Sequence, residues 1–193
     1  MTKVEILSNA LALLGQKPIN SLTNQNNITT AAEQAFDFLL PVILSTGFWR
    51  FATKIVELSQ LNITPPVTQW AYAYQLPGDF LKLVRLYPHN WAYELYTDRI
   101  MYSNIEGPQY IEYIFQPDVG QLPFYFNAYL VYRVAEYLAL SSAQNVQFSQ
   151  KLKEDMGVAM GVALAADCQN RPNTPMISQP IIADRAVSFF VYG

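Results

Sequence analysis

The chain has 193 residues, 51% of them hydrophobic, so it can bury one good core without splitting into independent domains. Charged residues make up only 14%, against about 25% in an ordinary soluble domain, and uncharged or aromatic side chains must therefore cover much of the surface. Such a surface commonly faces another protein. A net charge of -3 without a cluster of basic residues argues against a protein that binds the phosphates of nucleic acids.

Two predicted helices begin the chain. A capping box at residues 2–5 starts the first helix, and Gly15 ends it. A second capping box at residues 30–33 starts the next helix, which Pro41 should kink. The apolar residues that recur at helical spacing, and that we expect to be buried, are Ile6, Leu7, Ala10, Leu11 and Leu14 in the first helix and Phe36, Leu39, Leu40, Ile43 and Leu44 in the second.

The stretch GFWRFATKIVEL follows the second helix and gathers Phe48, Trp49 and Phe51 around one arginine. We expect these rings to lock the helix to the next element, as a hydrophobic core at a joint rather than as a partner-binding site. Arg50 should stack on the rings or cap the helix, and Gly47 should supply the turn at the helix exit.

From residue 51 to 117 the pattern changes to alternating, β-branched and aromatic segments between turn signals, which predicts a small antiparallel sheet. Pro77 and Gly78 suit a turn between two strands, and Asp98 with Arg99 suits a hairpin tip.

Helical periodicity returns after Pro123 and again from about Val146, where a fourth helix is expected to fray near Asp167. Three prolines then preclude a continuous helix. The remaining arm ends in an apolar composition that suits burial against a partner, through Ile181, Ile182, Phe189, Phe190 and Tyr192.

These elements predict an α+β fold: a four-helix bundle with an antiparallel β-rich insertion between helices two and three, and an extended C-terminal arm. The bundle would comprise residues 1–50 and 120–170, the insertion residues 51–119, and the arm residues 171–193.

Catalytic chemistry finds little support in the sequence. His89 and Cys168 could form a base and nucleophile pair, but no local signature accompanies them, and a loop histidine and a structural cysteine are the better interpretation. One His and one Cys cannot supply an ordinary zinc site, and no glycine-rich phosphate loop appears. We therefore expect no enzyme activity, no cofactor and no metal.

A nucleic-acid interface is the main alternative to a protein interface. Tyr72 and Tyr74, with Lys82 and Arg85, could stack on bases and contact phosphates from a sheet face. Ordinary sheet packing is the better explanation of these residues.

Membrane association and secretion are not expected. The N-terminal stretch MTKVEILSNALALLG lacks the cleavage region of a signal peptide. The longest apolar run, MGVAMGVALAA, is far shorter than the roughly 20 residues that cross a bilayer. The single cysteine, Cys168, excludes an intramolecular disulfide and suits a reducing compartment, so synthesis in the cytoplasm is expected.

Four segments occur in a telling order: LALLGQKPINSL, GFWRFATKIVEL, WAYAYQLPGDFLKLVRLY and YIEYIFQPDVGQLPFYFNAYLVYRVAEYLA. Over about residues 1–170 the chain thereby resembles the head-to-tail adaptor proteins of short-tailed phages, the tail tubular protein A group. Residues 171–193 match no pattern of that family.

The resemblance implies a non-enzymatic virion protein of the neck and tail, made in the host cytoplasm. It implies a twelve-membered ring that docks below the portal protein, extends the DNA channel and presents a platform for the tail nozzle protein. The free protein would be a monomer, and genomic DNA would pass without specific binding. The arm would dock on the portal or on a neighbouring subunit. A small phage nucleic-acid-associated or regulatory protein is the alternative, and a Cys-dependent hydrolase ranks well behind.

Overall fold

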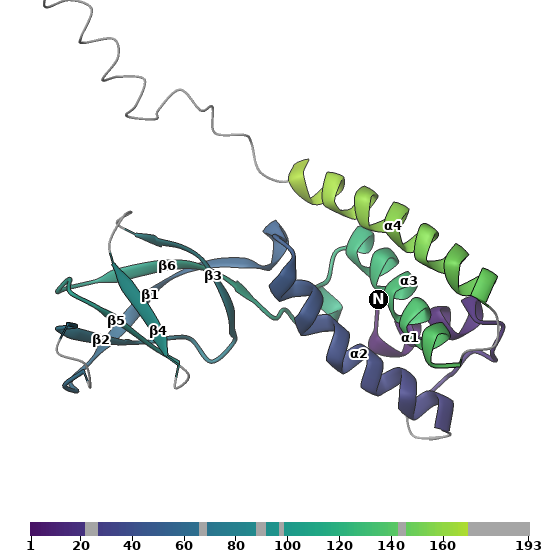
Figure 1. Cartoon of the computed structure of the whole chain (residues 1–193), viewed down its shortest axis with the longest axis horizontal. Coiled ribbons are helices and arrows are strands. Elements are labelled where there is room, and N and C mark those ends of the chain that lie inside the picture. Colours follow the sequence, from purple (N-terminus) through teal and green to yellow (C-terminus); the bar gives the residue numbers. More distant parts are fainter. Residues whose placement is uncertain (22–26, 66–68, 88–91, 97–98, 143–145, 170–193) are drawn as a thin grey trace, which may run out of the picture.

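The computed structural model of the chain describes residues 1–21, 27–65, 69–87, 92–96, 99–142 and 146–169. It consists of a helical part and an antiparallel sheet that lie side by side (Figure 1). The helices are α1 (Lys3–Leu13), α2 (Asn27–Thr46), α3 (Phe124–Ser142) and α4 (Val146–Gln169), and the short 3-10 helices η1 (Arg50–Ala52) and η2 (Val119–Gln121) lie at the two passages between the parts.

The predicted ends of α1 are confirmed. The Thr2 hydroxyl accepts a hydrogen bond from the Glu5 backbone, and the Glu5 carboxylate accepts one from the Thr2 backbone, as in a capping box. Gly15 adopts a left-handed φ of 70°, and its N–H donates to the carbonyl oxygen of Ala12. The predicted start of α2 at residues 30–33 is wrong, because α2 already begins at Asn27.

The sheet has six strands, and every neighbouring pair is antiparallel. Their order is β3-β6-β1-β2-β5-β4. β1 joins the two halves of the sheet, because residues 53–58 pair with β6 and residues 59–61 pair with β2. The strands are β1 (Thr53–Leu61), β2 (Tyr72–Gln75), β3 (Phe80–Tyr87), β4 (Tyr93–Tyr96), β5 (Ile100–Ser103) and β6 (Gln109–Phe115).

The chain turns at Pro77 and Gly78, as predicted, with the Phe80 N–H donating to the Pro77 carbonyl oxygen at 3.2 Å. The strands that this turn connects are not neighbours, because β6 and β1 lie between β2 and β3. Of the predicted hairpin tip, Asp98 lies outside the described residues, and Arg99 has a left-handed φ of 57°. The predicted small sheet is thus a six-stranded one with a crossover.

The prediction of a four-helix bundle carrying an insertion is wrong. α3 lies in the middle of the helical part, and α1, α2 and α4 each pack against it (Figure 1). α4 packs mainly on α3 and touches η1. The physical reason is a difference between the two helices: α3 buries side chains around much of its circumference, whereas the buried face of α4 is narrow, with Leu152, Ala163 and Asp167. One neighbouring helix is enough to bury so narrow an apolar face.

The sheet lies at one end of the helical part and also packs against its core (Figure 1). Ile114 of β6 is fully buried in the same cluster as the helices, and Leu81 and Val84 of β3 pack against that cluster. A second cluster lies within the sheet around Tyr74, Met101 and Ile111. The two parts are therefore joined by packing as well as by the chain.

Candidate partner interface

Trp49 fills the joint between the helical part and the sheet. Its side chain is 0% exposed, and its indole N–H donates to the carbonyl oxygen of Ile43 near the end of α2 at 3.0 Å. The ring meets Phe126 of α3 edge-on at 4.9 Å, and Phe51 contacts the same phenylalanine at 4.9 Å. Each such aromatic pair stabilises the fold by about 1 kcal/mol beyond the free energy gained from burying its surface area.

Gly47 leaves space for that indole. A Cβ atom at this position would lie 2.3 Å from Trp49 Nε1, closer than any side chain could tolerate without movement. Among the described glycines, the left-handed φ values belong to Gly15 and Gly107. The chain bends at Gly47 after α2, as expected, but without a left-handed φ, so the space for the indole is what requires a glycine there.

Asp167 ties the end of α4 to the joint. Its carboxylate is 1% exposed and accepts hydrogen bonds from the backbone N–H of Arg50 at 2.6 Å, the N–H of Phe51 at 3.3 Å and the hydroxyl of Tyr125 at 2.8 Å. Hydrogen bonds to a carboxylate are stronger than neutral ones, and a buried carboxylate needs them. The expected fraying near Asp167 is wrong, because the helix is held there.

Arg50 adds a second contact to the same end of α4. Its guanidinium donates to the carbonyl oxygen of Cys168 at 2.8 Å. Arg50 was expected either to stack on the aromatic rings or to cap a helix. The observed hydrogen bond resembles helix capping, but it caps α4 rather than α2. Sequence reasoning missed Asp167, and the signal that could have revealed it is a lone acidic residue at the end of the apolar run MGVAMGVALAAD.

Phe48, which was expected in the joint with Trp49 and Phe51, is not part of its buried core. Phe48 is 49% exposed and does not share the burial of Trp49 beside it. The arm residues Ile181, Ile182, Phe189, Phe190 and Tyr192 lie outside the described residues.

One exposed apolar face runs along α4. Val158 is 69% exposed and Val162 is 62% exposed, and they lie one helical turn apart. Gly157 and Gly161 lie beside them, and a Cβ at either glycine would meet nothing within 4 Å. This α4 face is therefore smooth, apolar and open.

A second exposed apolar face lies on α2 and α3. Phe38 of α2 is 56% exposed, and its ring lies 6.1 Å from that of Tyr137 of α3, which is 40% exposed. Val42 follows Phe38 by one turn of α2. This α2–α3 face differs from the α4 face in carrying large aromatic side chains, and α2 and α4 lie on opposite sides of α3 (Figure 1).

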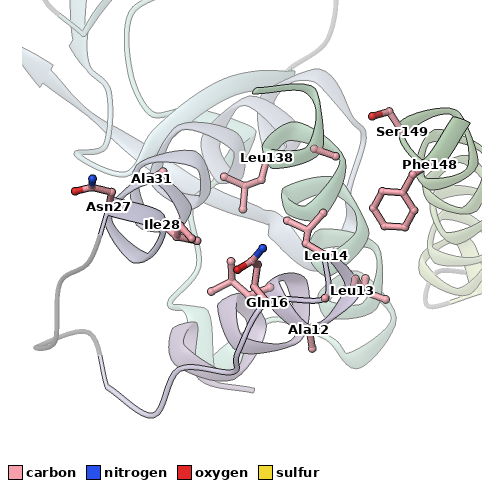
Figure 2. Close-up of a pocket in the computed structure, with 13 residues that line it drawn as sticks. Ala12, Leu13, Leu14, Gln16, Asn27, Ile28, Ala31, Leu138, Phe148 and Ser149 are labelled. Atoms are coloured by element: carbon pink, nitrogen blue, oxygen red, sulfur yellow. The ribbon is translucent and has the colours of Figure 1, made fainter. Parts of the chain in front are cut away.

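An apolar groove opens where the four helices approach one another, with a volume of about 760 Å³. Leu13 and Leu14 at the end of α1, Ile28 at the start of α2, Leu138 of α3 and Phe148 of α4 point toward one another around it (Figure 2). Its described lining residues include no charged side chain.

On the sheet, Asp79 is the centre of a small polar cluster. Lys54 Nζ lies 2.8 Å from its carboxylate, and the hydroxyl of Tyr113 donates to the same group at 2.8 Å. The hydrogen bond from Lys54 lowers the pKa of Asp79 below its ordinary value, and burial acts in the opposite direction. Burial and the Asp79 carboxylate raise the pKa of Tyr113.

The residues that could have formed a nucleic-acid surface do not come together. Tyr72 and Tyr74 lie on β2, whereas Lys82 and Arg85 lie on β3, and two strands separate them. Tyr74 is fully buried, and its hydroxyl donates to the carbonyl oxygen of Ile105 at 2.6 Å. Its ring is therefore not available for stacking on a base.

Within the described ranges, no group of three His, Cys, Asp or Glu side chains is arranged to hold a metal ion. Of the possible catalytic pair, Cys168 is exposed and His89 lies outside those ranges. None of the described helices is both long and apolar enough to cross a membrane.

No family model and no curated protein sequence matches this chain.

Proposed function

We propose that this protein is a subunit of a ring-shaped head-to-tail adaptor in the neck of a short-tailed phage virion, made in the host cytoplasm and without enzyme activity. One structural observation carries the proposal: exposed apolar side chains lie on two different faces, on opposite sides of α3. The order of the four sequence segments that resemble the adaptor family supports it.

A ring needs two unlike surfaces on each subunit, because each head-to-tail contact joins one face to a different face of the next copy. The α4 face and the α2–α3 face meet this requirement, because they lie at different places on the subunit and differ in the size of their side chains. Phe38 and Tyr137 project from one, while Gly157 and Gly161 leave the other open. Aromatic side chains set against small residues are a common interface composition.

The partners in this proposal are a second copy of the chain in a ring of about twelve, the portal protein above it and the tail nozzle protein below it. Among these contacts, we assign the arm residues Ile181, Ile182, Phe189, Phe190 and Tyr192 to the portal in preference to a neighbouring subunit. The net charge of -3 suits a channel through which DNA passes without being held. The free protein is expected to be a monomer, because docking on a portal holds neighbours at a high effective concentration.

Electron microscopy of the protein mixed with its portal tests the proposal. We expect a ring of density below the portal, and we expect the Val162→Asp variant to lose it, because an unpaired carboxylate is costly in an apolar interface. Lys153→Gln, an exposed change on the same helix, should leave the ring intact. Stable rings of the free protein at micromolar concentration would contradict the monomer, and a ring that survives Val162→Asp would contradict the role of the α4 face.

A further inference from the structure

We propose that the apolar groove between the four helices is the docking site for residues 181–192 of the same chain in the free protein. The groove is an open apolar surface, and nothing in the described residues fills it. Leu13 is 37% exposed, Ile28 46% and Phe148 39%, so three large side chains of its wall remain in contact with water (Figure 2). Covering them with an apolar segment removes that contact.

The chemistry of the wall selects an apolar occupant. Its described side chains carry no charge, and its polar groups are those of Gln16, Asn27 and Ser149 (Figure 2). A charged metabolite would lose its hydration there without gaining an ionic partner. A volume of about 760 Å³ is large enough for several side chains at once.

Three parts of this chain outside the described residues are candidates for that occupant. Residues 22–26, which precede α2, have the sequence LTNQN, and residues 143–145, between α3 and α4, have the sequence AQN, so each offers one apolar side chain, Leu22 or Ala143. Residues 181–192 have the sequence IIADRAVSFFVY, with two aliphatic and three aromatic side chains at the positions already assigned to partner binding and two charged ones, Asp184 and Arg185, between them. The last segment offers the most apolar surface to the wall.

The length of chain between α4 and this segment fits the route back to the groove. Along α4, about 32 Å separates Phe148, on the groove wall, from Gln169, at a rise of 1.5 Å per residue. The linker of residues 170–180 contains three prolines and covers about 34 Å if it is extended. Ile181 can therefore reach Phe148 when the linker runs back beside α4. Because the segment and the groove belong to one molecule, the effective concentration is high and a weak contact suffices.

The groove contact does not depend on the adaptor function. If that function holds as well, the portal has to take the arm from the groove, and the groove then restrains the arm until the portal is present. Failure of the portal experiment above would leave the groove contact standing, and failure of the test below would leave the portal contact standing.

Crosslinking in the full-length protein tests the contact. On a Cys168→Ser background, Ser188→Cys in the arm is combined with Ala31→Cys on the groove wall, and a short bismaleimide is added at micromolar protein. The matched control replaces Ala31→Cys with Ala165→Cys, another exposed alanine, on α4 near the root of the arm and outside the groove. We expect the intramolecular product to form about tenfold faster with Ala31→Cys. Equal rates, or a product that joins two chains, would overturn the proposal.

Ile28→Asp provides a second and independent variant. Ile28 lies in the first turn of α2, where an acidic residue is favoured by the helix dipole, so the fold should be retained and circular dichroism will check it. In this variant the crosslinking rate should fall to that of the control, and chymotrypsin should cleave the full-length protein after Phe189 and Phe190 about tenfold faster. Unchanged crosslinking and unchanged cleavage would overturn the proposal.

Discussion

The carboxylate of Asp167 lies 2.6 Å from the backbone nitrogen of Arg50, a contact between residues 117 positions apart in the sequence. It fastens the end of α4 to the passage where the chain leaves the helices for the sheet. The same carboxylate also accepts the Phe51 N–H and the Tyr125 hydroxyl, so three elements depend on one side chain.

Asp167→Asn should lower the free energy of unfolding by about 2 kcal/mol, because an amide cannot accept all three hydrogen bonds and leaves a buried donor unpaired. Urea denaturation measures the loss. Asp155→Asn, an exposed change on the same helix, should shift the free energy by no more than about 0.5 kcal/mol. Similar losses in the two variants would show that the Asp167 contacts contribute little.

Gly47→Ala should destabilise the protein by about 1–3 kcal/mol, because the added methyl group would lie 2.3 Å from Trp49 Nε1 and displace the indole. Gly157→Ala is the control, since open space surrounds that glycine on α4, and it should stabilise the protein by about 0.5–1 kcal/mol through helix propensity. Thermal melts of both variants distinguish the steric role of Gly47 from a general effect of replacing glycine.

Trp49→Ala should lower stability by about 3–5 kcal/mol, because the indole is fully buried between α2, α3 and η1. Partner binding should then fail only through unfolding. An unchanged melting temperature together with lost portal binding would instead place Trp49 in an interface.

Stability at acid pH should depend on Asp79. Its pKa in the folded protein lies below the ordinary value of 3.8, so the group contributes stability that is present above that value and is lost as pH falls through the lower folded-state pKa. Asp79→Asn should therefore lose less stability than the wild type between about pH 5 and pH 2. Lys54→Gln should behave similarly, whereas Lys82→Gln, on the neighbouring part of the sheet, should follow the wild type. Urea midpoints over this pH range provide the measurement.

Removal of the arm should separate folding from assembly. A protein ending at Asn170 should keep its helical circular dichroism but no longer sediment with the portal, because apolar side chains worth about 1.5–3 kcal/mol each when fully buried are gone. Portal binding that survives the truncation would show that the arm is not the anchor.

Features of this fold that depend on residues close together in the sequence were predictable. The capping box at Thr2 and Glu5 and the stop at Gly15 depend on residues within one or two turns, and both are present. The strand-rich section was likewise visible as a change of period. The start of α2 was not predicted correctly, because a capping-box pattern at residues 30–33 can also occur inside a helix that begins at Asn27.

Long-range relationships were not predictable from periodicity. An apolar stripe shows that a helix buries one face, but it does not show that α3 has three helical neighbours and α4 mainly one. Alternation likewise identifies strands without giving the order in which β6 and β1 separate β2 from β3. Asp167 was missed for the same reason, since its partners are more than 40 positions away in the sequence.

The central place of α3 also determines when this protein can finish folding during its synthesis. α1 and α2 leave the ribosome first, yet the helix on which both pack is complete only after residue 142. At about 5–20 residues per second, the buried face of α2 stays without that helix for roughly 5–20 seconds. The sheet, complete at residue 115, is the part that can form in the meantime. The nascent chain is therefore expected to present the apolar face of α2 to chaperones until the second half of the helical part emerges.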